Sequence, residues 1–108
     1  MIFHQWAKAW DNADIETMRS LMHDDAEMLM HSSNSKISAD EWRDRIEPMI
    51  INLKQENLRC VYENQDILVM HFIMTFPNET RDAVMFVAMK EDGKIKRIET
   101  GSTPLPAE

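Results

Sequence analysis

Four extended runs in the second half of the chain constrain its fold more than any other feature. They lie at residues 56–63, 67–76, 82–90 and 94–100, with short polar turns between them. The last turn, Asp92-Gly93, is a strong hairpin signal because both residues tolerate positive φ. Turns this short join neighbouring strands that run antiparallel. The pattern therefore predicts a four-stranded antiparallel meander.

The first half of the chain has a helical period instead. Phe3, Trp6 and Trp10 recur at intervals of three and four residues, as on the apolar face of an amphipathic helix. Asp14 can cap a second helix, because an aspartate side chain accepts hydrogen bonds from the free N–H groups at a helix start. A short strand is expected after that helix, at residues 27–32.

A third helix is indicated by Ser38 and Glu41, which form a capping box. The helix should run through Trp42 and Ile46. Pro48 should kink it or end it early, because proline removes a backbone hydrogen bond.

The predicted order is thus helix, helix, strand, helix and four strands. Helices packed on one face of an antiparallel or mixed sheet make an α+β fold. A chain of 108 residues has room for one such core and not for two. We expect a single domain over residues 1–101 and a C-terminal tail over residues 102–108.

Charge and composition limit the classes of function. The net charge of −7 argues against nucleic acid and anionic membranes as partners, since both need clustered Lys and Arg. No apolar run is long enough to span a membrane, and the N-terminus lacks the features of a signal peptide. A single cysteine, Cys60, fits a reducing compartment, so we expect a cytoplasmic protein.

The run at residues 82–90 predicts that another protein chain covers one face of the sheet. Ala83, Met85, Val87 and Met89 alternate with Val84, Phe86 and Ala88, so both faces of this strand are apolar. A strand with two apolar faces is normally covered on both. One face can pack on the helices, and a homodimer is the simplest cover for the other.

Two segments resemble a known superfamily. WAKAWDNADIETMRSLMHDDAEM near the start and MKEDGKIKRIETG near the end, in this order of elements, resemble nuclear-transport-factor-2-like proteins of the SnoaL-like branch. Polyketide cyclases and ketosteroid isomerases belong to that superfamily. The resemblance implies a curved sheet wrapped around a long helix, a cone-shaped pocket between them and, commonly, a dimer.

The resemblance also allows a test for isomerase chemistry, which needs a carboxylate base and an oxyanion hole made by a tyrosine and a protonated aspartate. Counting from the shared motifs places these three roles on Trp6, Met30 and Met85. Trp6 retains an N–H donor, but a methionine can neither take nor donate a proton. We therefore expect no isomerase reaction of this type.

His31 and Glu99 are the remaining candidates for acid–base catalysis. His31 has a suitable unperturbed pKa. It points into the pocket only if a bulge reverses the first strand; otherwise Met28 and Met30 point inward and His31 lies near solvent. Glu99 lies on the last strand, where members of the superfamily often place a polar pocket residue, and a surface pair with Arg97 is the alternative.

The expected pocket is apolar and rich in methionine, of which the chain has ten. Its expected lining residues are Trp6, Trp10, Met28, Met30, Trp42, Met74 and Met85. The chain has no ligand cluster at metal-binding spacing and no glycine-rich phosphate loop, so we expect neither a metal nor a cofactor.

Three functions remain open. The first is binding of a small apolar molecule, and the second is acid–base catalysis on an apolar carbonyl or ring compound by His31 or Glu99. The third is a dimeric interaction module whose pocket is closed. A cavity walled by Trp, Met and Leu favours binding, whereas a buried ionisable group beside an empty space favours catalysis.

Overall fold

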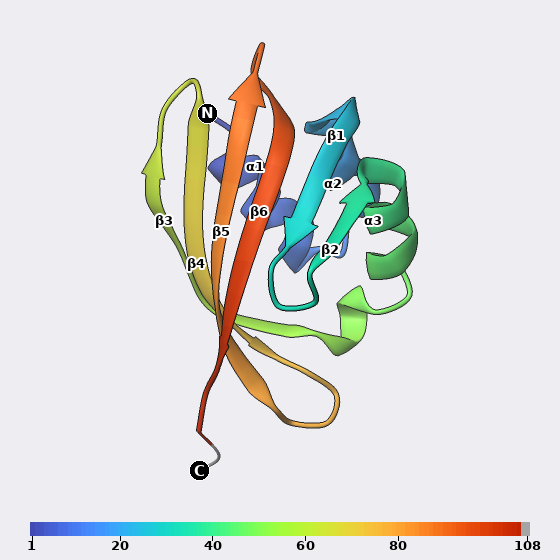
Figure 1. Ribbon diagram of the computed structural model, residues 1–108, viewed down its shortest axis with the longest axis vertical. Coiled ribbons are helices and arrows are strands. Elements are labelled where there is room, and N and C mark those ends of the chain that lie inside the picture. The colour runs from blue at the N-terminus through green and yellow to red at the C-terminus, as the bar shows by residue number, and fades with distance from the viewer. Residues whose placement is uncertain (107–108) are drawn as a thin grey trace.

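Helices and a curved sheet form two layers in the computed structural model, which describes residues 1–106 (Figure 1). The helices are α1 (Phe3–Asp11), α2 (Ile15–Ser20), α3 (Ala39–Ile46) and the short 3-10 helix η1 (Ile50–Asn52). The strands are β1 (Met22–Met30), β2 (Ser35–Ser38), β3 (Lys54–Glu63), β4 (Ile67–Thr75), β5 (Arg81–Glu91) and β6 (Lys94–Pro104). None of the helices in residues 1–106 is long and apolar enough to cross a membrane.

The six strands form one mixed sheet in the order β2-β1-β6-β5-β4-β3. The predicted meander is confirmed, because β3, β4, β5 and β6 pair antiparallel in succession. β1 lies parallel to β6 and pairs with β2 on its other side. The predicted α+β class and order of elements are confirmed, and the structure adds β2 and η1 to them. β2 is four residues long and contains a single apolar residue, Ile37, so its sequence carries little strand signal.

Both predicted helix caps are present. The Asp14 carboxylate accepts a hydrogen bond from the Thr17 N–H at 3.1 Å. Ser38 and Glu41 form the reciprocal capping box, with N–O distances of 3.2 and 3.1 Å. α3 ends at Ile46, so the early end expected from Pro48 is confirmed.

The last strand is longer than predicted. β6 continues to Pro104, and Asp82 pairs with Pro104, so residues 102–104 belong to the sheet and not to a tail. β5 extends far enough to pair with them, whereas Gly101-Ser102-Thr103 shows no apolar alternation that would indicate a strand. The rest of the expected tail includes residues 107–108, which lie outside the described residues.

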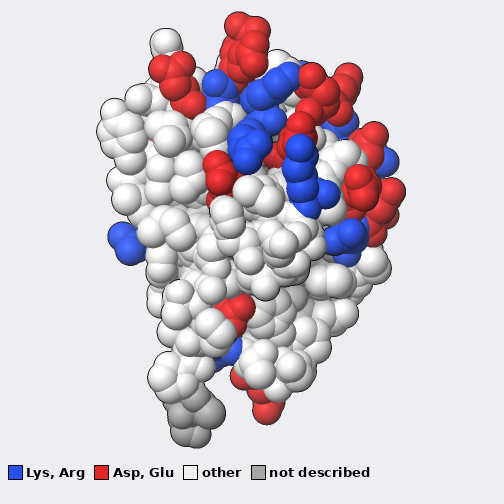
Figure 2. Space-filling view, viewed as in Figure 1, with Lys and Arg blue, Asp and Glu red and all other residues white. Residues whose placement is uncertain are grey.

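The core lies between the helices and the inner face of the sheet. Its fully buried side chains include Met18 of α2, Leu68 and Met70 of β4, and Ile95 and Ile98 of β6. We call the opposite side the outer face, formed centrally by Val69, His71 and Ile73 of β4 and by Ala83, Met85 and Val87 of β5. Charged side chains gather at one end of the molecule and over β1 and α3, and few lie over β4 and β5 (Figure 2).

Candidate functional site

A cavity of about 210 Å³ lies between α1, α3 and the inner face of the sheet. It is open to solvent at one side, where Met49 is 46% exposed. Its lining residues are Trp6, Trp10, Met28, Met30, Trp42, Ile46, Met49, Leu53, Gln55, Phe72, Met74, Phe76, Val84, Phe86 and Thr100.

Trp6, Trp10 and Trp42 of α1 and α3 form an aromatic wall on the helical side of the cavity. Trp6 and Trp10 are four residues apart on α1, so they project from one face of that helix. Trp42 comes from the first half of α3. The rings of Trp6 and Trp42 lie 5.9 Å apart, and the rings of Trp6 and Phe86 lie 5.4 Å apart. Trp6 therefore joins both helices to the sheet at the centre of the wall.

The opposite wall of the cavity is the inner face of the sheet, where alternate side chains of each strand point toward the helices. Met28 and Met30 are two residues apart on β1, and both line the cavity. Met30 pairs with Thr100 of β6, and Thr100 pairs with Phe86 of β5, so these three side chains form a row across the sheet. On β3, Gln55 pairs with Met74 of β4 and adds an amide to the lining.

The lining contains no ionisable side chain. Its polar groups are the Gln55 amide, the Thr100 hydroxyl and the indole N–H groups of the three tryptophans. Within residues 1–106, none of these five side chains has a hydrogen-bond partner in the protein. The cavity thus has neutral donors and a large apolar surface, but no group that could act as a general acid or base.

Most of the expected pocket residues line this cavity, namely Trp6, Trp10, Met28, Met30, Trp42 and Met74. Met85 does not, since it lies on the outer face and is 43% exposed. Its neighbours Val84 and Phe86 point inward instead. Counting back from the hairpin with one residue of slack cannot distinguish the two faces of a strand, because side chains alternate with a period of two. Val84 and Phe86, the residues that do point into the cavity here, cannot donate a proton either.

His31 and Glu99 lie outside the cavity lining and face each other. β1 ends at Met30, and the His31 Nε2 atom lies 3.4 Å from Glu99 Oε1. The second Glu99 oxygen accepts a bond from the Arg97 Nε at 3.4 Å, which is the alternative pairing that the sequence allowed. The first strand has no bulge beyond Glu27 that would turn His31 inward.

A shift of register in β6 explains the direction of Glu99. Lys90 pairs with Ile95, but Met89 pairs with Arg97, so β6 has one extra residue at this point. Ile95 and Ile98 are both buried although they are three residues apart. Arg97 and Glu99 consequently share the outer face, while Ile95 lies on the inner one.

Glu63 has a structural role that the sequence did not reveal. Its carboxylate accepts hydrogen bonds from the N–H groups of Ile2 and Phe3, at 2.7 and 3.2 Å, and so caps α1. It also accepts a bond from the Lys90 Nζ at 2.9 Å. The side chains of Glu63 and Lys90 are only 7% and 3% exposed. The pair attaches the start of α1, and with it Trp6 and Trp10, to β3 and β5.

The environment of Glu63 also changes its acidity. Burial by itself raises the pKa of Glu63. The two backbone N–H groups and the Lys90 ammonium favour the charged form more strongly, so the pKa lies below its ordinary value. No simple sequence signal could have shown this, because the partners are 27 to 61 residues away in the chain.

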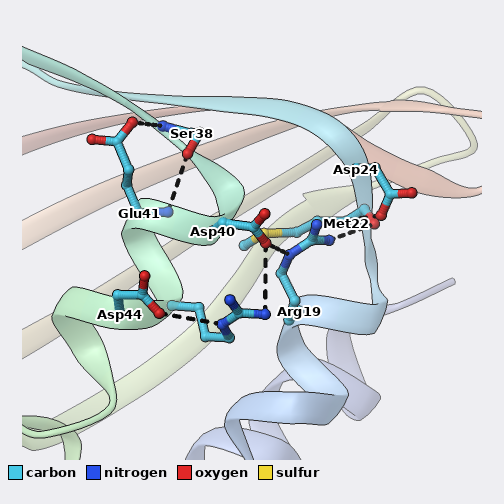
Figure 3. Close-up of polar contacts among 8 residues, drawn as sticks. Arg19, Met22, Asp24, Ser38, Asp40, Glu41 and Asp44 are labelled. Atoms are coloured by element: carbon cyan, nitrogen blue, oxygen red, sulfur yellow. Dashed lines mark hydrogen bonds and ion pairs between the residues drawn. The ribbon is translucent and has the colours of Figure 1, made fainter.

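A second polar cluster fixes α2 to α3 (Figure 3). Arg19 of α2 donates through Nε to Asp40 of α3 at 3.0 Å and contacts Asp24 of β1 at 3.3 Å. The capping box of Ser38 and Glu41 lies beside this cluster at the start of α3. Together these bonds hold the helix that carries Trp42. Within residues 1–106, no group of three or more His, Cys, Asp or Glu side chains is placed to hold a metal ion.

Solved structures show the class of this fold. An NTF2-like protein from Cytophaga hutchinsonii matches with a TM-score of 0.74 and 10% identity, over 89% of this chain and 81% of that one. A candidate ketosteroid isomerase from Kribbella flavida matches at 0.74 and 11%, over 97% and 77%. IdmH from Streptomyces antibioticus, a candidate polyketide cyclase, matches at 0.69 and 13%, over 90% and 86%. The fold is therefore NTF2-like.

Sequence comparison shows the family within that class. Residues 3–98 match the SnoaL-like domain, and the chain belongs to this family. No curated protein matches the chain by sequence. The resemblance seen in the sequence is confirmed at the level of family and fold.

Proposed function

We propose that this protein binds a small, largely apolar molecule in the cavity between α1, α3 and the sheet. The observation that carries the proposal is the lining itself, which surrounds about 210 Å³ with tryptophan, methionine and other apolar side chains and contains no ionisable group. Mostly apolar cavities with a few polar groups are typical of small-molecule sites. A plain interaction module would need no cavity of this kind.

Acid–base catalysis in this cavity has less support. A general acid or base must come within hydrogen-bond reach of the reacting atom, directly or through one water. His31 and Glu99 are absent from the lining and bond to each other and to Arg97. Trp6 and Met30, to which counting from the shared motifs assigns the tyrosine and the carboxylate of the isomerases, both line the cavity. Binding without isomerase chemistry fits these residues better.

The named relatives support a ring compound as the ligand class. IdmH is a candidate polyketide cyclase, and the Kribbella flavida protein is a candidate ketosteroid isomerase. Flat apolar rings would pack against the indole rings of Trp6 and Trp42, which lie side by side in the wall.

A cavity-filling variant tests the proposal. Met30→Trp should fill the space beside Thr100 and abolish the binding of small ring compounds, measured by calorimetric titration. Leu29→Trp is the matched control, because it adds the same side chain at the next position of β1, where the side chain points to the opposite face. Equal loss of binding in both variants, or equal retention, would refute the cavity as the binding site.

We further propose that the outer face pairs with a second copy of the chain. Val69 lies opposite Val87 and Ile73 opposite Ala83, so apolar side chains adjoin across β4 and β5 on both sides of the His71–Met85 pair. Met85 is 43% exposed at the centre of this face. A contiguous apolar patch of this kind on a sheet supports an association surface.

A further inference from the structure

The volume of the cavity limits the size of its ligand. Pockets for drug-sized molecules measure about 300–1,000 Å³, and a dry cavity of about 150 Å³ holds benzene. The cavity here, at about 210 Å³, lies between a one-ring site and a drug-sized site. It has room for one ring with a short substituent, or for two small fused rings. A four-ring compound would extend out of it.

The lining also limits the charge of the ligand. No ionisable side chain borders the cavity, so a carboxylate, phosphate or ammonium group inside it would find no counter-ion. Burying an unpaired charge is far more costly than burying a neutral polar group. The net charge of −7 on the chain adds a further cost for anions. The ligand should therefore be neutral.

The unpaired polar groups indicate which hydrogen-bonding group the ligand carries. An indole N–H can only donate a hydrogen bond. Trp6 and Trp42 are only 2% and 6% exposed, and within residues 1–106 neither has a hydrogen-bond partner in the protein. Neither indole nitrogen is fully enclosed by protein atoms, so an N–H that the protein leaves unpaired is open to an acceptor oxygen of a ligand in the cavity. Trp6 is the more buried of the two and lies against both Trp42 and Phe86.

We infer that the cavity selects a neutral compound of one ring, or two small fused rings, which presents a carbonyl or similar acceptor oxygen to the indole N–H of Trp6. This inference rests on the proposed binding function and adds the size, charge and polarity of the ligand. Trp6 is the specificity-determining donor. The remaining wall of methionine and phenylalanine packs on the ring.

A matched set of ligands tests each part separately. Acetophenone and ethylbenzene have nearly the same shape, but only acetophenone has an acceptor oxygen. Acetophenone should bind about tenfold more tightly, as expected for one net hydrogen bond. Progesterone, a four-ring ketone, should not bind, nor should benzoate. Binding is measured by calorimetry and by the three indole N–H signals in ¹H–¹⁵N spectra, of which the Trp6 signal should shift most with acetophenone.

Two variants assign the donor. Trp6→Phe keeps an aromatic ring but removes the N–H, so the ratio of the two affinities should fall from about tenfold to about one. Tyr62→Phe, which removes a polar hydrogen from an aromatic side chain outside the cavity lining, should leave the ratio unchanged. If Trp10→Phe or Trp42→Phe removes the preference and Trp6→Phe does not, the assignment to Trp6 is wrong. Spectra of each variant show whether it is folded.

The outcomes separate this inference from the proposed function. Failure of every compound, ethylbenzene included, would contradict the binding function itself. Equal affinity for acetophenone and ethylbenzene would contradict only the acceptor, and tight binding of progesterone only the size. Tight binding of benzoate would contradict only the neutrality of the ligand.

Discussion

At the scale of single residues, Glu63 has two roles: it forms a buried ion pair with Lys90, and it holds the start of the helix that carries Trp6 and Trp10. It caps α1 through the N–H groups of Ile2 and Phe3 and neutralises Lys90, which is 3% exposed. Removing one partner of a buried pair leaves the other charge without compensation, and this usually costs more than the intact pair contributed. The same contacts determine where α1 begins, and therefore where Trp6 lies.

We predict that Glu63→Gln lowers the free energy of unfolding by about 3 kcal/mol, because Lys90 would remain buried without a carboxylate. Urea denaturation at neutral pH measures the change. Glu56→Gln is the matched control on the same strand, since Glu56 makes a surface ion pair with Lys54. It should have little effect. A similar small effect for both variants would show that the buried pair does not stabilise the fold.

The effect of Glu63→Gln should also depend on pH. The pKa of Glu63 is lowered in the folded protein, so the unfolded chain takes up this proton first as the pH falls. Its contribution is complete above the ordinary glutamate pKa of about 4.3 and is lost as the pH falls through the lower pKa of the folded state.

We therefore expect the stability difference between wild type and Glu63→Gln to be largest near neutral pH and to shrink below about pH 4. Denaturant titrations of both proteins at several pH values measure it. The wild type alone is not diagnostic, because the pKa values of Asp14, Asp25, Glu27 and Glu56 are lowered too. A difference that stays constant down to pH 3 would contradict the assignment to Glu63.

Residue identity and alternation predicted most of the cavity wall but not all of it. Trp6, Trp10 and Trp42 followed from helical spacing, and Met28 and Met30 from the period of a strand. Met85 was placed on the wrong face because motif counting does not resolve a shift of one residue. Glu99 could not be placed, since the extra residue in β6 has no sequence signal of its own. Gln55 was missed because a single polar residue at a strand start is common.

At the scale of elements, the stability of the short helix α3 depends on the hydrogen bonds and ion pairs at its N-terminal end. α3 has eight residues, too few for a stable isolated helix, so its cap and its packing have to hold it. The Ser38–Glu41 box and the Arg19–Asp40 pair supply those contacts. Trp42 lies in the first half of this helix and depends on them for its position.

Ser38→Ala should lower the free energy of unfolding by about 1 kcal/mol, because the Glu41 N–H loses its side-chain acceptor. Thermal or urea denaturation measures the loss. Ser33→Ala provides the control, as Ser33 lies in the exposed turn before β2 and caps no helix. Equal stability of the two variants would mean that α3 is held without its cap.

The elements themselves were largely predictable. Caps, the Asp92-Gly93 turn and the change from helical to strand period identified three helices and five of the strands. Asp92 and Gly93 adopt the positive φ values of 53° and 81° that the hairpin signal implied. β2 and the end of β6 were missed because their sequences are polar. Pairing with an already formed neighbour, rather than their own propensity, makes them strands.

At the scale of the whole molecule, the part of the outer face over β4 and β5 has few charges, although the net charge of the chain is −7 (Figure 2). If this face joins two copies, Met85 lies in the middle of the interface opposite His71. The cavity is on the other side of the sheet, so dimer formation leaves it accessible. Association and ligand binding should therefore be separable.

We predict that Met85→Lys converts a dimer into a monomer, because it places a charge in an apolar interface. Sedimentation or light scattering measures the mass in solution. Ile51→Lys is the control, since Ile51 is 80% exposed on η1, away from the outer face. A wild-type protein that is already monomeric, or a Met85→Lys variant that remains dimeric, would exclude this face as the interface.

The most direct test of ligand binding in the cavity is a high-resolution crystal structure of the protein as purified from cells. We expect density for a small ring compound inside the cavity, in contact with Trp6 and Met30 and with an oxygen near the Trp6 N–H. His31 and Glu99 should face each other and not the compound. A cavity closed by its own methionine side chains, or a bound molecule at His31 and Glu99 instead, would contradict it.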